Sequence, residues 1–302
     1  HEEQMKADTT FRDRIHILLD SAEKKSWKQV EDLDESLINE YDRITDSIQR
    51  DFQEGLGFFN LLKKSIMSIF DSSEGMKEWT NKITGRIESE LRPSLENKIR
   101  EGLGSLADSI QHMATSIDNE ILKSKAGIKS NNQVFTDIAN KRQERFEQLH
   151  RNFNEWASNA NNFVASDLLD QSNSLLPQVQ AGGALAVIGA VLAAITHGTF
   201  LDVTGGILSV VGLTIAGVAA AFSKNKIVRQ FADEIAKGRQ KLDDQLEDKL
   251  KTYVREIKTK IDNNFFEFDT FLAEERRQLD DLTFTYKDIE QKFAKIQKEL
   301  NI

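Results

Sequence analysis

The sequence has no cysteine and only two prolines among its 302 residues. The missing cysteines exclude disulfides and thiolate metal sites, and they fit a reducing compartment such as the cytoplasm. Few residues would interrupt a helix, because the prolines are confined to Pro93 and Pro177 and half of the 16 glycines lie between Gly182 and Gly217. The composition therefore favours long helices on both sides of one glycine-rich segment.

Motifs of the common enzyme classes are also missing. No glycine-rich loop is followed by the lysine of a phosphate-binding motif, and no G-x-S-x-G motif occurs. The five histidines are scattered, and none pairs with another at the spacing of a metal site. We expect a chain that is not an enzyme and has no cofactor or metal.

The charge balance argues against nucleic acid as a partner. The chain has 49 acidic and 40 basic residues and a formal net charge of −9. Coulomb attraction to nucleic acid or to an anionic bilayer is therefore not the main driving force for binding. Any binding to a membrane must be mostly hydrophobic.

Apolar residues recur at helical spacing along most of the chain. Steps of three and four residues form stripes over 30–52, 83–123, 132–170 and 227–300, and Pro93 predicts a kink or a helix restart within the second stripe. Strand-like alternation of useful length is absent. The stripes predict an all-α fold, an elongated antiparallel helical bundle with long helices whose stripes bury one another.

The middle of the chain is different, because it is apolar on all sides. Two apolar runs, 181–195 and 205–222, are joined by the polar segment HGTFLDVT, which contains Asp202, the only formal charge of the block. We expect a central apolar helical hairpin that either crosses a bilayer or lies along its surface, because an aspartate at the bilayer centre costs about 2.5 to 3.5 kcal/mol. Each run is short for a membrane span, which needs about 20 residues.

Three regions follow from these patterns. The expected regions are N-terminal helical bundle segments over 1–180, the apolar membrane-binding hairpin over 181–222, and one or more long amphipathic helices over 223–302 that return along the bundle. Neither lysine nor arginine occurs from Asn152 to Ser223, and three cations follow at once. An abrupt basic edge beside an apolar block is typical of a membrane interface.

The candidate site is a lipid-binding surface. Its basic edge, Lys224, Lys226 and Arg229, is expected to meet lipid headgroups. The expected insertion surface consists of the larger apolar residues of the block: Leu185, Val187, Ile188, Val191, Leu192, Ile195, Phe200, Leu201, Val203, Ile207, Leu208, Val211, Leu213, Ile215, Val218 and Phe222.

The string FLDVTGGIL at 200–208, between an Ala/Gly-rich apolar run and a basic edge with a long amphipathic helix, resembles the membrane-binding paddle of bacterial dynamin-like proteins. The segment 261–282 and the heptad-like run after it are similar to the neck helix of that family. The resemblance implies a neck, trunk and paddle that tether or remodel membranes, with a lipid bilayer and a homo-oligomer or dynamin-like partner. Its implied location is the cytoplasm, peripheral or hairpin-anchored at the inner membrane. The family's GTPase domain has no counterpart here.

Two other functions fit the same patterns. One is a component of an α-helical pore-forming toxin, which would be secreted and would store the apolar hairpin against its bundle before inserting it. The other is a soluble coiled-coil scaffold, in which the apolar block is permanent core. Lipid preference, oligomer symmetry, insertion depth and the choice between fusion, fission and pore formation are left open by the sequence.

Overall fold

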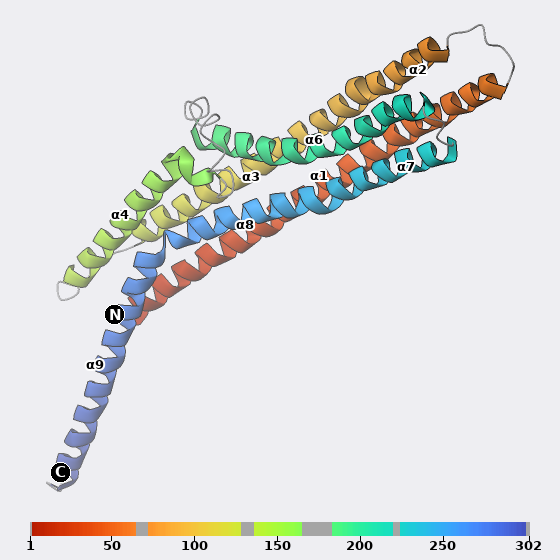
Figure 1. The fold of residues 1–302 in the computed structure, drawn as a ribbon. Helices are drawn as coiled ribbons and strands as arrows, with labels where there is room; N and C mark the ends of the chain where they lie inside the picture. The colour runs from red at the N-terminus through yellow and green to blue at the C-terminus, as the bar shows by residue number, and fades with distance from the viewer. Residues whose placement is uncertain (1, 65–71, 128–135, 165–182, 220–223, 300–302) are drawn as a thin grey trace. The chain divides into compact units, whose positions relative to one another are not determined.

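The computed structural model describes residues 2–64, 72–127, 136–164, 183–219 and 224–299 (Figure 1). These residues are almost entirely helical and contain no strand, so the predicted all-α bundle class is confirmed. The chain forms two compact units, one assembled from three segments of the chain and the other from two. The terminal unit consists of 1–23, 111–162 and 256–302, and the central unit consists of 24–110 and 163–255.

The long helices agree with the predicted stripes. The α-helices are α1 (Glu2–Lys64), α2 (Ser72–Arg86), α3 (Arg92–Ala126), α4 (Thr136–Ser158), α6 (Gly183–Ala219), α7 (Lys224–Gln240), α8 (Glu247–Asn263) and α9 (Phe266–Glu299). A 3-10 turn follows α4 at Ala160–Phe163, and π-helical turns lie at Ile87–Leu91 and Lys241–Leu246. The predicted stripe over 132–170 extends at both ends beyond the described residues.

The irregularity expected near Pro93 is a π-helical turn. Pro93 is the second residue of α3 and has no backbone N–H to donate. The wider turn Ile87–Leu91 precedes it, and the N–H of Arg92 donates to the carbonyl of Ile87. The backbone therefore continues from α2 into α3 through one widened turn.

The stripe over 227–300 is divided between separate helices. The chain turns at Asn264 and Phe265, between α8 and α9. The Asn264 side chain donates to the carbonyl of Lys260 at 2.8 Å, which satisfies one of the unpaired carbonyls at the end of α8. A single continuous helix over this stripe is therefore not formed.

Phenylalanine side chains form the core of the terminal unit. Phe11 of α1 contacts Phe146 of α4 edge to face at 5.1 Å between ring centroids, and Phe268 of α9 at 5.4 Å. Phe265, in the turn before α9, is fully buried beside Phe11 and Phe153. Aromatic pairs of this kind add stabilisation beyond the area they bury.

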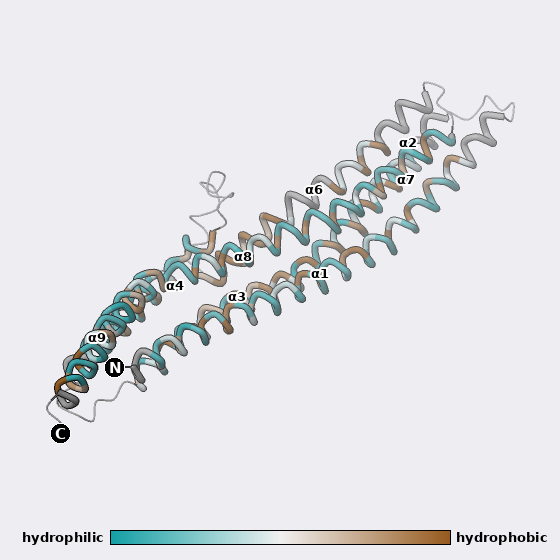
Figure 2. The backbone as a smooth tube through the Cα atoms, turned by 90° about the horizontal axis from the view of Figure 1, so that it is seen from below, coloured by the Kyte–Doolittle hydropathy of each residue, from teal (hydrophilic) through white to brown (hydrophobic). Residues whose placement is uncertain are grey.

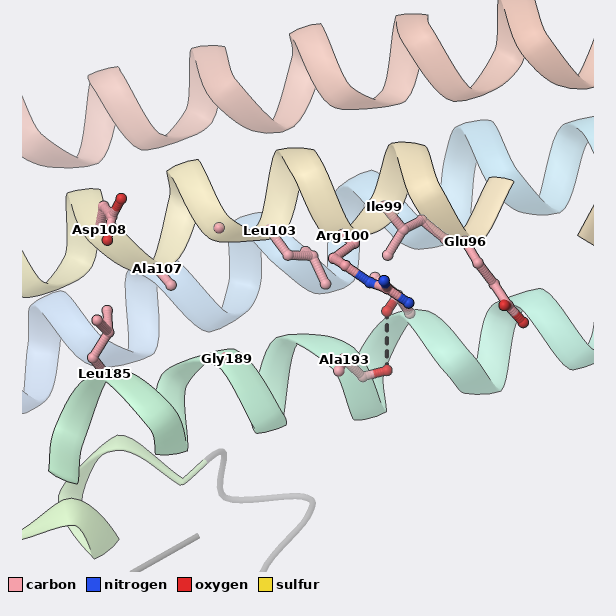
Figure 3. Close-up of a pocket in the computed structure, with 11 residues that line it drawn as sticks. Glu96, Ile99, Arg100, Leu103, Ala107, Asp108, Leu185, Gly189 and Ala193 are labelled. Atoms are coloured by element: carbon pink, nitrogen blue, oxygen red, sulfur yellow. Dashed lines mark hydrogen bonds between the residues drawn. The ribbon is translucent and has the colours of Figure 1, made fainter. Parts of the chain in front are cut away.

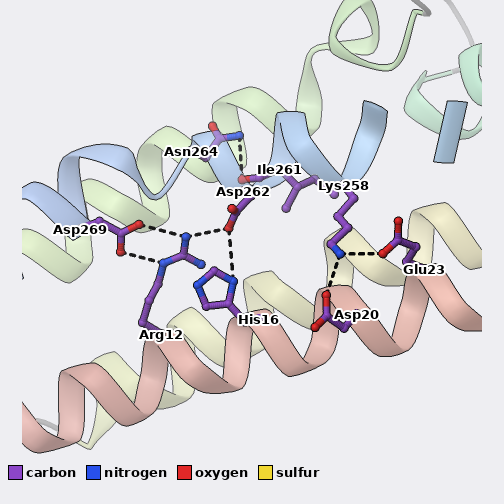
Figure 4. Close-up of polar contacts among 9 residues, drawn as sticks. All are labelled: Arg12, His16, Asp20, Glu23, Lys258, Ile261, Asp262, Asn264 and Asp269. Atoms are coloured by element: carbon purple, nitrogen blue, oxygen red, sulfur yellow. Dashed lines mark hydrogen bonds and ion pairs between the residues drawn. The ribbon is translucent and has the colours of Figure 1, made fainter. Parts of the chain in front are cut away.

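A buried arginine connects α1 to the turn between α8 and α9. Figure 4 shows Arg12 between two carboxylates: it donates to Asp269 at 2.7 and 3.0 Å and to Asp262 at 2.7 Å. Its guanidinium also lies 4.7 Å from the centroid of the Phe265 ring. About two turns further along α1, Asp20 and Glu23 each pair with Lys258 of α8 at 2.6 Å. These contacts fix how α1 packs against the chain's C-terminal helices.

In the central unit, α1 packs antiparallel to α7. Phe52 stacks on Phe231 with ring centroids 3.9 Å apart, and the Tyr41 hydroxyl donates to the carbonyl of Ile235 at 2.8 Å. Residue numbers rise along α1 as they fall along α7, so the two helices run in opposite directions. The antiparallel arrangement expected from the stripes is therefore present within this unit.

Candidate membrane-binding helix and the groove beside it

The apolar block forms one continuous helix. The backbone of α6 is helical through the segment where the sequence predicted a turn, so the expected hairpin is wrong. HGTFLDVT contains no proline, and the buried residues on either side of it keep one register: Ile188, Leu192 and Thr196 before it, Val203 and Ile207 after it. Steps of four or seven residues place all five on one face of a helix, and their burial favours a continuous backbone over a turn.

The predicted insertion surface is divided between two faces of α6. Leu185 is exposed, and Ile195 and Leu208 are partly exposed. Lys226 and Arg229 are exposed on the first turns of α7. The side chains of Phe200, Leu201, Leu213, Ile215, Val218, Phe222 and Lys224 lie outside the described part of the structure. Seven residues of the predicted surface are core: Val187, Ile188, Val191, Leu192, Val203, Ile207 and Val211.

The buried face of α6 packs closely against α7. Gly238 of α7 leaves room for Val203 and for the Tyr41 hydroxyl, since a Cβ at this position would lie 2.4 Å from that oxygen and 3.1 Å from the valine methyl. On the same face, the buried Thr196 hydroxyl donates to the carbonyl of Leu192 at 3.0 Å, so it leaves no unpaired polar group in the core.

The exposed side chains of α6 are nearly all apolar or small. Within the described part of α6 they belong to Leu185, Ala186, Ala193, Gly205 and Ser209, which lie on more than one side of the helix. Surface helices normally place charged residues on their outer face. Figure 2 shows the contrast with α7, whose tube carries hydrophilic residues along its length. Among the side chains of α6 that the structure describes, none of the exposed ones is charged, and a soluble bundle does not require this.

A groove separates α6 from α3. Its volume is about 530 Å³, and Leu185, Gly189, Ala193 and Thr196 form its α6 side (Figure 3). The α3 side combines apolar residues such as Leu103 with the charged side chains of Glu96, Arg100 and Asp108. The small residues of α6 leave this space open, so α6 contacts α7 closely and α3 loosely. Sequence reasoning missed the α3 residues, whose stripe pattern indicates only a core.

Three carboxylates meet beside the same core. Asp34 of α1 approaches Asp243, in the π-helical turn, and Glu247 of α8, with one oxygen of each within 4.8 Å of the others. Asp34 is buried, and its Oδ1 has no hydrogen-bond partner. A signal was present in the sequence, because Asp34 falls in the stripe formed by Val30 and Leu37.

Carboxylate oxygens are the ligands that Mg²⁺ and Ca²⁺ prefer. Here two of the three already face cations: Arg239 lies 3.7 Å from Asp243, and Lys251 lies 2.5 Å from Glu247. Burial, together with the charges of Asp243 and Glu247, raises the pKa of Asp34 to about 7, although Arg239 opposes the shift. Protonation of Asp34 would reduce the repulsion among the three carboxylates, so the cluster needs no metal ion and we assign none to it.

Replacing Asp34 with asparagine should flatten the dependence of stability on pH. The pKa of Asp34 is near 7 in the folded chain and near 4 in the unfolded chain, so the folded state holds the extra proton between these values. Native stability therefore falls as pH rises through this window, by up to about 1.4 kcal/mol per pH unit. Urea unfolding of both chains from pH 4 to 8 measures the difference. Asp34→Asn should be the more stable chain at pH 8, and parallel profiles would show that Asp34 is not protonated in the folded state.

Within the part of the chain that the structure describes, no helix is both long and apolar enough to cross a membrane.

Comparisons with known proteins give no family for this chain. No protein-family model matches it, and no characterised protein sequence does either. Among solved structures, a computationally designed three helix bundle aligns over 87% of this chain and 94% of the designed chain, with 10% sequence identity and a TM-score of 0.27. A likeness at that score carries no argument about topology or function.

Proposed function

We propose that this chain is a membrane-binding helical stalk in which α6 provides the apolar surface that contacts lipid. One observation carries the proposal: none of the exposed side chains that the structure describes on α6 is charged. Along its whole length, from Gly183 to Ala219, α6 contains one charged residue, Asp202. Burial against α7 accounts for one face of this composition, and contact with lipid would account for the other.

The continuous helix favours an orientation along the membrane surface. A helix of 37 residues is about 55 Å long, whereas the hydrocarbon core of a bilayer is about 30 Å thick. Asp202 lies near the middle of α6, so a spanning α6 would place this carboxylate near the bilayer centre, at a cost of about 2.5 to 3.5 kcal/mol. An α6 that lies in the plane of the interface avoids this cost, and its exposed apolar residues Leu185 and Ala193, beside the groove, could contact acyl chains.

The start of α7 would assist this orientation. Lys226 and Arg229 are exposed, and basic residues near an anionic leaflet contribute about 1 kcal/mol each. The net charge of −9 opposes that attraction, so the apolar face of α6 has to supply most of the binding free energy. We therefore expect lipid binding that persists at high salt.

The resemblance to dynamin-like paddles suggests that the bound stalk tethers or remodels membranes. A second candidate is favoured by a different observation, namely that most of the bulky side chains described on α6 are buried. Val191, Leu192 and Ile207 are concealed against the bundle, as an insertion element of a pore-forming protein would be before its release. The two functions differ in whether a sealed vesicle leaks when the chain binds to it.

Flotation with dye-filled vesicles tests the proposal. The paired change Leu185→Glu and Ala193→Glu places two charges at exposed apolar positions of α6, beside the groove, and should reduce the bound fraction at least tenfold. The matched control, Gln245→Glu with Thr252→Glu, adds the same charge to exposed polar positions of the central unit and should bind as the native chain does. Both variants should keep the native helical content, because all four side chains are exposed or small.

Each outcome has a distinct meaning. Binding without dye release, lost in the α6 variant, supports a tethering stalk. Rapid dye release that requires α6 supports the pore-forming function. If the native chain does not float with vesicles of zwitterionic or anionic lipid, or if the α6 variant binds as well as the control, the membrane proposal is wrong and α6 belongs to a soluble scaffold.

A further inference from the structure

The C-terminal half of α9 carries an exposed apolar stripe. Tyr286, Ile289, Phe293 and Ile296 are 63%, 46%, 64% and 51% exposed. Every described side chain from 283 to 296 is exposed, and Figure 1 shows α9 running on beyond the start of α1 in the same unit. Soluble monomers rarely leave so many large apolar side chains together in water. This surface therefore has the character of an interface.

The stripe has the spacing of a coiled coil. Its described members follow one another at steps of three, four and three residues, and the sequence extends the alternation to neighbouring leucines outside the described side chains. A strict average of 3.5 residues selects a left-handed coiled coil, in which apolar seams of two or more helices interlock. We call the four described residues of this stripe the α9 seam: Tyr286, Ile289, Phe293 and Ile296.

The α9 seam continues an interface that exists within the chain. Phe265 and Phe268 fall in the same register and pack against Phe11 and Phe146, with ring centroids 5.1 to 6.2 Å apart. The same stripe thus packs on helices of its own unit at one end and is exposed at the other. Large apolar residues occupy the stripe along its whole length, so its exposed part is suited to packing against other helices as its buried part does.

A second copy of the seam is a fitting partner. Its two aromatic members, Tyr286 and Phe293, can each bury about 150 to 250 Å² against a partner helix. In a parallel pair, the residues beside the seam of one copy meet those of the other: Thr285 lies against Glu290, and Lys292 against Gln297, so no like charges meet. An antiparallel pair centred at Glu290 would instead bring the two Glu290 carboxylates together.

We infer that the α9 seams of two or more copies of this chain associate as a parallel coiled coil. The inference goes beyond membrane binding and does not depend on it. Sedimentation equilibrium without lipid tests it on the full chain. The native chain should show an average mass at least twice the 34.3 kDa of one copy, rising with concentration.

Two variants distinguish association through the α9 seam from nonspecific hydrophobic association. Ile289→Glu with Phe293→Glu should return the mass to that of one copy. Phe284→Glu with Gln291→Glu places the same charges on the outer face of the same helix, where Phe284 is 78% exposed, and should leave association unchanged. All four positions are exposed, so unfolding should not confuse the comparison, and circular dichroism of each variant checks this.

Single cysteines test the direction of pairing, since the native chain has none. Ile289→Cys and Ile296→Cys should each give a disulfide-linked dimer under mild oxidation, because a parallel seam brings each position within disulfide reach of its own copy. Phe284→Cys should not. A native chain that is monomeric at its highest soluble concentration, equal loss of association in both charge variants, or linkage at 284 as fast as at 289 would each overturn the inference.

Discussion

Val191→Asp should lower the free energy of unfolding by about 4 kcal/mol or more. Val191 is 6% exposed on the face of α6 that packs into the central unit, where a carboxylate would lose its hydration and find no partner. Changes that large arise from few mechanisms, and an unpaired buried charge is one of them. Urea unfolding followed by circular dichroism measures the effect.

The control lies two residues away on the same helix. Ala193 is exposed, so Ala193→Asp should change stability by less than about 0.5 kcal/mol. Similar costs for the two substitutions would mean that α6 does not present one buried and one exposed face, and the argument for a lipid-binding outer face would fail with it. The pair also shows why lipid-binding variants belong at Leu185 and Ala193, since a change at Val191 would unfold the site under test.

Arg12→Met should cost about 2 to 3 kcal/mol. The guanidinium is buried to nine-tenths and holds Asp262 and Asp269 together beside the ring of Phe265. Breaking a fully buried ion pair costs about 3 to 5 kcal/mol. The expected cost is lower here because the two carboxylates keep about two-fifths of their exposure and remain partly hydrated.

Arg14→Met is the comparison for this substitution. Arg14 pairs with Glu120 at 2.5 Å, but its side chain is 44% exposed, and surface ion pairs contribute at most about 1 kcal/mol. Thermal unfolding of both variants separates the two environments. A cost for Arg12→Met no greater than that for Arg14→Met would show that the cluster around Arg12 does not stabilise the terminal unit.

The helices could be predicted from the sequence because their apolar stripes carry the information locally. Phe52 and Phe231 stand in such stripes, and they stack on one another in the core of the central unit. The break at Asn264 was not predicted, because the apolar spacing continues through it and only the asparagine side chain marks the helix end. Spacing alone does not distinguish one long helix from two helices that share a stripe.

The two faces of α6 could not be derived from composition. A helix apolar on every side gives no periodic signal, so sequence reasoning assigned Val191 and Leu185 to one lipid-binding surface, whereas only Leu185 is exposed. The turn predicted within HGTFLDVT was wrong for a related reason. Glycine and threonine can occupy helical positions when the residues around them are buried along one side of the helix. Asp34 shows the converse, because its position in the stripe formed by Val30 and Leu37 was visible while its acidic neighbours came from a distant segment.

The most direct test of membrane binding by α6 is the polarity around its exposed face. The chain has no cysteine, so Ala193→Cys can carry a single polarity-sensitive fluorophore, with Gln245→Cys as the matched position on the polar surface of the same unit. On addition of vesicles, the account predicts a blue-shifted emission at position 193 and an unchanged emission at position 245. An unchanged emission at position 193, with vesicles of every composition, would contradict the claim that α6 contacts lipid.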